Sequence, residues 1–325
     1  MDKVVEQLNN EGVSLFLNGD FEKAKNKYLE ALDLFPGYPT TLNNLGMVFL
    51  QEKKYQEAKT CFLKASREKE NSTYRLNLGH AYANLNRLEE AEQCYLKSVE
   101  LNPGSLMAWK SLAALYQFQK KYRHSVNVWQ NIIGNYSRDP YCKIQLAKDL
   151  IALKEYSQAL ALISEAAGYE QYQDQVWYVT ALIYFFQNNF GLAETAVNKA
   201  VAMNPGNESY RMLAAAVYLG LSQPDKALGQ WDYLLAANEN LHHVRIDKAV
   251  TLLAHGFRQE ALHELNLVLL KDSAQVKALF YKALILMETG TDEEEATGIL
   301  TALQAGGHDF SAKASELLSK LKNNP

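Results

Sequence analysis

Residues 5–38 read VEQLNNEGVSLFLNGDFEKAKNKYLEALDLFPGY, and this stretch decides the fold because its small residues Gly12 and Ala24 return at a fixed interval. Steps of 34 residues, with a single step of 33, carry the first series through Gly12, Gly46, Gly79, Ala113, Ala147, Ala181, Ala215, Ala249 and Ala283. The second series keeps the same step and comprises Ala24, Ala58, Ala91, Ser125, Ala159, Ala193, Ala227 and Ala261. A strict period of this size predicts a stacked repeat array, in which each unit buries its apolar face only against its neighbours.

Each unit reads as a pair of helices joined by a short turn. In the first unit, Leu8 and Gly12 lie on one face of a helix because they are four residues apart. Residues 18–20 are Asn-Gly-Asp, which favours a tight reversal. A second helix follows with Tyr28 on its inner face, and Pro36 ends it. The small residues should let the two helices approach closely, while Tyr28 fills the gap against the next unit.

This pattern resembles the tetratricopeptide repeat, whose consensus combines Leu-Gly, Tyr, Ala, an aromatic residue, Ala and Pro. The front half of the consensus is matched by Trp109, Leu112, Ala113 and Tyr116, and the back half by Ala91, Tyr95, Ser98 and Pro103. The resemblance covers residues 5–310 and implies an all-α fold, an α-solenoid wound as a right-handed superhelix of helix-turn-helix repeats.

No linker or change of composition divides the chain, so we expect a single domain. We expect residues 1–325 to form a single solenoid with repeats at about 5–38, 39–71, 72–105, 106–139, 140–173, 174–207, 208–241, 242–275 and 276–310. The last repeat departs from register, since Ala296 comes one place late. Residues 311–322 read as a lone amphipathic helix that caps the exposed end of the stack.

Composition limits the possible partners and compartments. The formal net charge of −4 provides no basic surface for a phosphate backbone, so we expect no nucleic acid partner. Apolar stretches fall short of the ~20 residues of a membrane span. A charged helical start with no signal peptide favours the cytoplasm, or the periplasm or secretion if a leader was removed. The three cysteines are expected to be buried free thiols, because equivalent helices stand too far apart for a disulfide.

In tetratricopeptide repeats, the residues two, six, nine and thirteen places into each unit face the inner groove. Asn10, Asn44 and Asn77 occupy the same place in the first three units, with His80 and Asn84 as neighbours. An amide side chain offers both donors and an acceptor, so such a row could hold the backbone of an extended peptide. It resembles the asparagine ladder of O-GlcNAc transferase superhelices. Gln145 would extend the row beyond Ser111, which interrupts it. The alternatives are plain polar surface, or asparagines copied by duplication of the unit.

Further along, the same face becomes apolar. Phe118 and Phe186 are predicted to contact apolar side chains of a partner, and Lys148 to supply a polar anchor. The alternative is that the stack buries part of this face itself, which we expect for Leu213 and Ala216.

Catalytic and metal-binding motifs are not found. The chain has no phosphate-binding glycine loop, nucleophile elbow or Cys-x-x-Cys pair, and His263-Glu264 lacks the second histidine of a zinc protease motif. We therefore expect no enzyme activity, no cofactor and no metal. The interpretation is a non-catalytic scaffold that binds an extended peptide or partner protein in the concave groove. The alternatives are a self-associating assembly protein and the targeting arm of a multidomain enzyme; the oligomeric state is left open.

Overall fold

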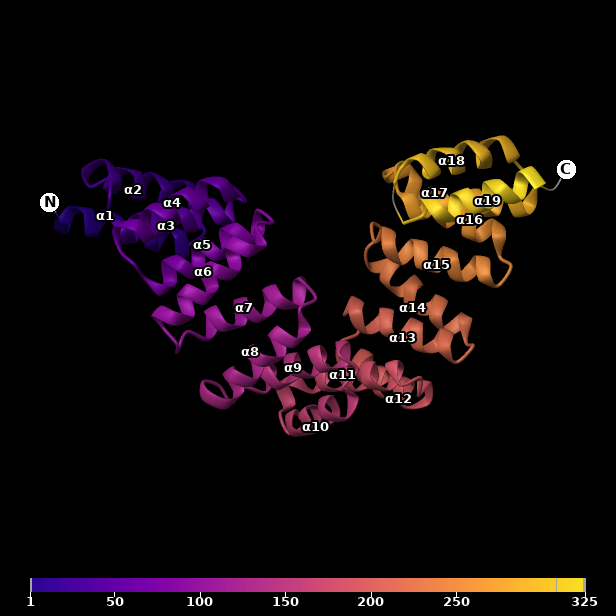
Figure 1. Cartoon of the computed structure of the whole chain (residues 1–325), viewed down its shortest axis with the longest axis horizontal. Helices are drawn as coiled ribbons and strands as arrows, with labels where there is room; N and C mark the ends of the chain where they lie inside the picture. The colour runs from indigo at the N-terminus through magenta and orange to yellow at the C-terminus, as the bar shows by residue number, and fades with distance from the viewer. Residues whose placement is uncertain (1, 308, 324–325) are drawn as a thin grey trace. The chain divides into compact units, whose positions relative to one another are not determined.

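The structure, a computed structural model, describes residues 2–307 and 309–323. This part of the chain contains nineteen α-helices and one short 3-10 helix, and no strand. Consecutive helices pair into hairpins (Figure 1). The predicted fold class, an all-α helical repeat, is therefore confirmed. The chain divides into two compact units, Met1–Tyr169 and Glu170–Pro325.

The first unit contains five helical hairpins. Its helices are α1 (Asp2–Leu17), α2 (Phe21–Leu34), α3 (Pro39–Gln51), α4 (Tyr55–Glu68), α5 (Ser72–Asn84), α6 (Leu88–Leu101), α7 (Leu106–Phe118), α8 (Tyr122–Asn135), α9 (Pro140–Ala152) and α10 (Tyr156–Ala166). In each hairpin the odd-numbered helix comes first and the even-numbered helix second.

The second unit contains four hairpins and a final helix. After a 3-10 turn, η1 (Glu170–Tyr172), its helices are α11 (Gln173–Phe186), α12 (Phe190–Met203), α13 (Glu208–Gly220), α14 (Pro224–Ala237), α15 (His242–Ala254), α16 (Arg258–Lys271), α17 (Val276–Thr289), α18 (Glu293–Ala305) and α19 (Ser311–Asn323). From α3 to α17, the first helix of each hairpin begins within one residue of the repeat start expected from the sequence. That residues 1–325 form one continuous solenoid stays a prediction.

The small residues bring the two helices of a hairpin into contact. All members of the second small series are fully buried, from Ala24 to Ala261. A Cβ atom placed on Gly46 would lie 2.6 Å from the ring of Phe62, which is itself fully buried. The same is true of Gly12 against Tyr28, at 2.5 Å. The ring of the second helix therefore fills the space that the missing side chain leaves on the first helix of the same hairpin. The close approach was predicted from the sequence, and Tyr28 also packs with Leu45 and Val48 of the next hairpin, where it was expected.

Every hairpin turns through one residue in the left-handed backbone region. Glycine holds this place in the first hairpin and in the last two, at Gly19, Gly256 and Gly290. The six hairpins between them use other residues, namely Lys53, Asn86, Lys120, Lys154, Asn188 and Ser222, with φ between 57° and 63°. Because this region is unfavourable for residues with a Cβ atom, the repeated turn geometry is imposed by helix packing rather than by local preference.

The final helix α19 covers the end of the second unit, where Figure 1 shows it beside α17 and α18. Ala314 and Leu318 pack into a cluster with Phe280 and Leu300. Ala296, the residue that comes one place late in the sequence pattern, is fully buried. The last hairpin thus keeps its packing with a shifted register.

Candidate partner-binding face

A chain of asparagine amides links the first helices of the first three repeats. Asn77 Nδ2 donates to Asn43 Oδ1 at 2.8 Å, and Asn44 Nδ2 donates to Asn9 Oδ1 at 2.9 Å. Within each Asn-Asn pair a longer bond of 3.4 Å completes the path, from Asn43 to Asn44 and from Asn9 to Asn10. We call Asn9, Asn10, Asn43, Asn44 and Asn77 the amide chain. In both of its bonds between repeats the donor belongs to the later repeat, so the bonds run from α5 to α3 and from α3 to α1.

Two of the three asparagines in the predicted row, Asn44 and Asn77, link one repeat to the preceding one through the amide chain. Asn77 is buried, Asn44 is half-buried and Asn10 is exposed. Asn44 and Asn77 each commit one amide donor to the preceding repeat, so these donors are engaged within the protein. Sequence reasoning missed Asn9 and Asn43, although the doubled asparagine in the first two units was a visible signal. A ligand-binding role for the row stays a prediction.

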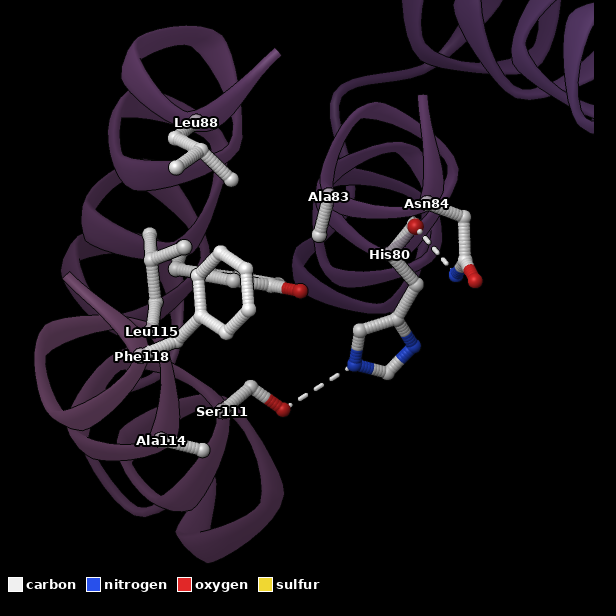
Figure 2. Close-up of a pocket in the computed structure, with 9 residues that line it drawn as sticks. His80, Ala83, Asn84, Leu88, Ser111, Ala114, Leu115 and Phe118 are labelled. Carbon is white, nitrogen blue, oxygen red and sulfur yellow. Dashed lines mark hydrogen bonds between the residues drawn. The ribbon is translucent and has the colours of Figure 1, made fainter. Parts of the chain in front are cut away.

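Beyond the amide chain, the structure brings three predicted residues together around one hollow. His80 and Asn84 reach it from α5 and Phe118 reaches it from α7, as Figure 2 shows. The hollow measures about 370 Å³, and its lining is completed by Ala83, Leu88, Tyr95, Ser111, Ala114 and Leu115. Phe118 is 69% exposed, so its ring offers an apolar surface beside the hollow. A hollow with an apolar lining and a few polar groups suits one apolar side chain of a partner.

The polar groups of the hollow are held in place by the protein itself. His80 Nε2 and Ser111 Oγ form a direct hydrogen bond of 3.0 Å that joins α5 to α7 (Figure 2). Asn84 Nδ2 donates to the backbone oxygen of His80 at 2.9 Å. Burial lowers the pKa of His80, which favours the neutral imidazole at neutral pH. The hollow therefore presents no positive charge of its own.

On α9 the face continues with two further predicted residues, Gln145 and Lys148, both half-buried. Burial lowers the pKa of Lys148, and the adjacent carboxylate of Asp149 only partly offsets this. Asp149 itself is 2% exposed and accepts a hydrogen bond of 2.8 Å from Gln117 on α7. Its second oxygen, Oδ2, makes no hydrogen bond of ordinary geometry, and neither does the buried indole nitrogen of Trp129, although Ser125 and Trp129 both act to lower the pKa of the carboxylate. Sequence reasoning did not identify Asp149, whose burial depends on three packed helices.

In the second unit, Phe186 at the end of α11 is 52% exposed and contacts Phe185 edge-on. Leu213, where we expected burial by the stack, is 7% exposed, and Val179 is fully buried. Much of the apolar sequence on this stretch is thus core.

A larger hollow of about 540 Å³ lies between α14, α15 and α16 of the second unit. Its central charges neutralise one another, because Lys248 pairs with Asp232 at 2.8 Å and with Glu264 at 2.6 Å. Arg245 pairs with the other oxygen of Glu264. These ion pairs stabilise the packing of the three helices and leave the hollow of the first unit as the better candidate site.

Three further properties concern the part of the chain that the structure describes. All three cysteines are buried free thiols, as the sequence predicted, and burial raises the pKa of Cys61 to about 11. None of the described helices has the length and apolar character to cross a bilayer. Among the same residues, no group of three or more His, Cys, Asp or Glu side chains could hold a metal ion.

Stacked hairpins with an open face along their first helices define an α-helical repeat protein. The chain belongs to the tetratricopeptide repeat family, which matches it at residues 5–38, 39–72, 74–105 and 144–208. The predicted family is therefore confirmed.

A curated relative is the anaphase-promoting complex subunit 3 of Schizosaccharomyces pombe, 24% identical over 275 residues. The match spans 80% of this chain and 41% of that protein. The chain thus corresponds to less than half the length of the relative.

Two solved structures illustrate the likeness of fold. A tetratricopeptide repeat protein from Parabacteroides merdae superposes with a TM-score of 0.64 at 17% identity, covering 77% of this chain and 99% of that one. The human IFIT1 dimer with m7Gppp-AAAA superposes with a TM-score of 0.60 at 15% identity, covering 98% of this chain and 82% of that one. At such identities the likeness shows the fold alone.

Proposed function

We propose that the protein is a non-catalytic scaffold that binds an extended segment of a partner protein. The segment would lie along the first-helix face of the first unit, which is the surface formed by α1, α3, α5, α7 and α9. The observation that carries this proposal is the hollow between α5 and α7, with the ring of Phe118 69% exposed beside it. A large aromatic ring left in water is available for burial by a partner, and buried aromatic residues are frequent anchors of interfaces. Membership of the tetratricopeptide repeat family supports a role in protein interaction.

The hollow, rather than the amide chain, is the proposed anchor. Donors of Asn44 and Asn77 are engaged between repeats, whereas the hollow is open and most of its lining side chains are apolar. Asn10, exposed at the end of the amide chain, and Gln145 on α9 would contact the backbone of the bound segment on either side. Phe186 belongs to the second unit, and a contact of its exposed ring with a partner stays a separate prediction.

The test is selection of binding peptides from a random 12-residue display library on the full chain. A selected peptide is then titrated by calorimetry against the wild type and against Phe118→Asp. Leu270→Asp is the matched control, because Leu270 on α16 is 80% exposed and lies outside the first-helix face. We expect Phe118→Asp to weaken binding at least tenfold and Leu270→Asp to leave it unchanged. Failure to select any peptide, or equal affinity for wild type and Phe118→Asp, would overturn the proposal.

A role inside a larger assembly is the second candidate, favoured by the relative that is a subunit of the anaphase-promoting complex. Self-association is the form of this role that the chain can show alone. Light scattering over a hundredfold range of concentration tests it: a mass that stays at one chain throughout excludes self-assembly, and a mass that rises supports it.

A further inference from the structure

Lys148 lies on α9, in line with residues of α5 and α7 that line the hollow. His80, Ala114 and Lys148 each follow directly on a member of the first small series, and they are separated by 34 residues. They therefore occupy the same place on the first helices of three successive repeats, α5, α7 and α9. His80 and Lys148 are half-buried and Ala114 is exposed, so the row is open to a partner along its length.

The charge of Lys148 is not neutralised by an ion pair. Two other lysines of α7 and α9 are paired, Lys110 with Asp139 at 3.8 Å and Lys143 with Glu165 at 2.6 Å. Among the described residues, no carboxylate forms such a pair with Lys148. Its neighbour Asp149 turns into the core, where its side chain accepts a hydrogen bond from Gln117.

A half-buried cation without a partner has lost part of its hydration and gained little in return. A carboxylate from a binding partner would supply the missing opposite charge. It would pair with the ammonium group of Lys148, which is already partly desolvated. Such a contact contributes more than one between fully hydrated groups.

We infer that the segment bound at the hollow carries an aspartate or glutamate side chain that pairs with Lys148, three to five residues from the apolar side chain that enters the hollow. This inference rests on the proposed function and specifies its ligand. The separation follows from geometry. Neighbouring packed helices stand about 10 Å apart, and an extended chain advances about 3.3 Å per residue. The span from the hollow between α5 and α7 to Lys148 on α9 is therefore about three to five residues.

The same 12-residue display library tests the inference when it is selected in parallel on three proteins. These are the wild type, Lys148→Met and Lys143→Met. Methionine keeps most of the side-chain volume while removing the charge. Lys143→Met is the matched control because it removes one charge from the same helix, from a lysine that already has a partner.

We expect wild-type selections to be enriched in peptides with an apolar residue and an acidic residue three to five positions away. Lys148→Met should lose the acidic enrichment and keep the apolar one, and Lys143→Met should keep both. For one selected peptide, Asp→Asn should weaken binding to the wild type about tenfold and leave binding to Lys148→Met unchanged.

Apolar enrichment that depends on Phe118 without any acidic preference would overturn this inference and leave the proposed function standing. The inference also fails if the acidic preference survives in Lys148→Met. A library that yields no binding peptide would remove the proposed function and the inference with it.

Discussion

Asn77 Nδ2 donates a 2.8 Å hydrogen bond to Asn43 Oδ1, joining residues 34 positions apart in the chain. The bond repeats the one that Asn44 makes to Asn9, so two successive repeat interfaces are linked by the same chemistry. Both interfaces lie among buried or half-buried side chains, where an amide without a partner is costly. The asparagines of the first-helix face are therefore part of what aligns one repeat on the next.

Replacing Asn77 by Ala should lower the free energy of unfolding by about 1–3 kcal/mol, because Asn43 Oδ1 loses its donor in a buried setting. Urea unfolding followed by circular dichroism measures the change. Asn10→Ala is the control: it holds the equivalent place in the first repeat but is exposed, and it should change stability by less than about 0.5 kcal/mol. Equal effects of the two variants would show that the hydrogen bond between Asn77 and Asn43 does not stabilise the interface.

Gly46→Ala should destabilise the first unit by about 1–3 kcal/mol, as is usual when a packed core receives an extra methyl group. The new Cβ atom would stand 2.6 Å from the ring of Phe62, which is fully buried and has little room to move. The comparison is Gly134→Ala in the last turn of α8, where nothing lies within 4 Å of the added atom. That variant should be neutral or slightly more stable in thermal unfolding. A neutral Gly46→Ala would contradict the close approach of α3 and α4.

Lys120→Gly should stabilise the protein by up to about 1 kcal/mol, since Lys120 has a φ of 57° that is unfavourable for a residue with a Cβ atom. The flexibility of glycine in the unfolded chain offsets part of the gain. Lys120→Val should act in the opposite direction because branching at Cβ makes this backbone region still less favourable. Thermal melts of the three proteins should therefore rank glycine, lysine and valine in falling order, and any other order speaks against strain at this turn.

Asp149→Asn should raise the stability of the first unit at pH 7, by about 1 kcal/mol, the lower end of the penalty for a buried unsatisfied polar group. Burial raises the pKa of Asp149 above its ordinary 3.8, although Ser125, Gln117, Lys148 and Trp129 oppose the shift. The folded protein therefore binds this proton more tightly than the unfolded chain does. Stability from this group is present below pH 3.8 and is lost as the pH rises through the folded-state value.

The gain from Asp149→Asn should accordingly shrink as the pH is lowered from 7 towards 4, and urea midpoints at pH 7, 5.5 and 4.5 measure it. Asp139→Asn on the same hairpin should show no such gain, because Asp139 is only half-buried and pairs with Lys110. A loss of stability at pH 7 in Asp149→Asn would mean that the ionised carboxylate is favoured by its surroundings.

The sequence by itself determined the helices, their pairing and the family. Gly12, Ala24 and their successors recur with one period, and close helix approach requires small residues at those places whatever the rest of the chain does. Such a requirement is local, so it can be read along the chain from Gly12 to Ala283 without knowledge of the neighbours. The face that carries His80 and Phe118 was also predictable, because helical spacing alone places the residues of one face in line.

Only the tertiary structure decided what those side chains do. Asn9 and Asn10 differ by one helical step of about 100°, yet Asn9 is buried and Asn10 is exposed, since only Asn9 is turned towards the next repeat. The hollow joins His80 to Phe118, which come from different repeats, and the burial of Asp149 needs α7, α8 and α9 together. Contacts between helices depend on how each side chain meets its neighbour in space, and a single-chain pattern does not contain that information.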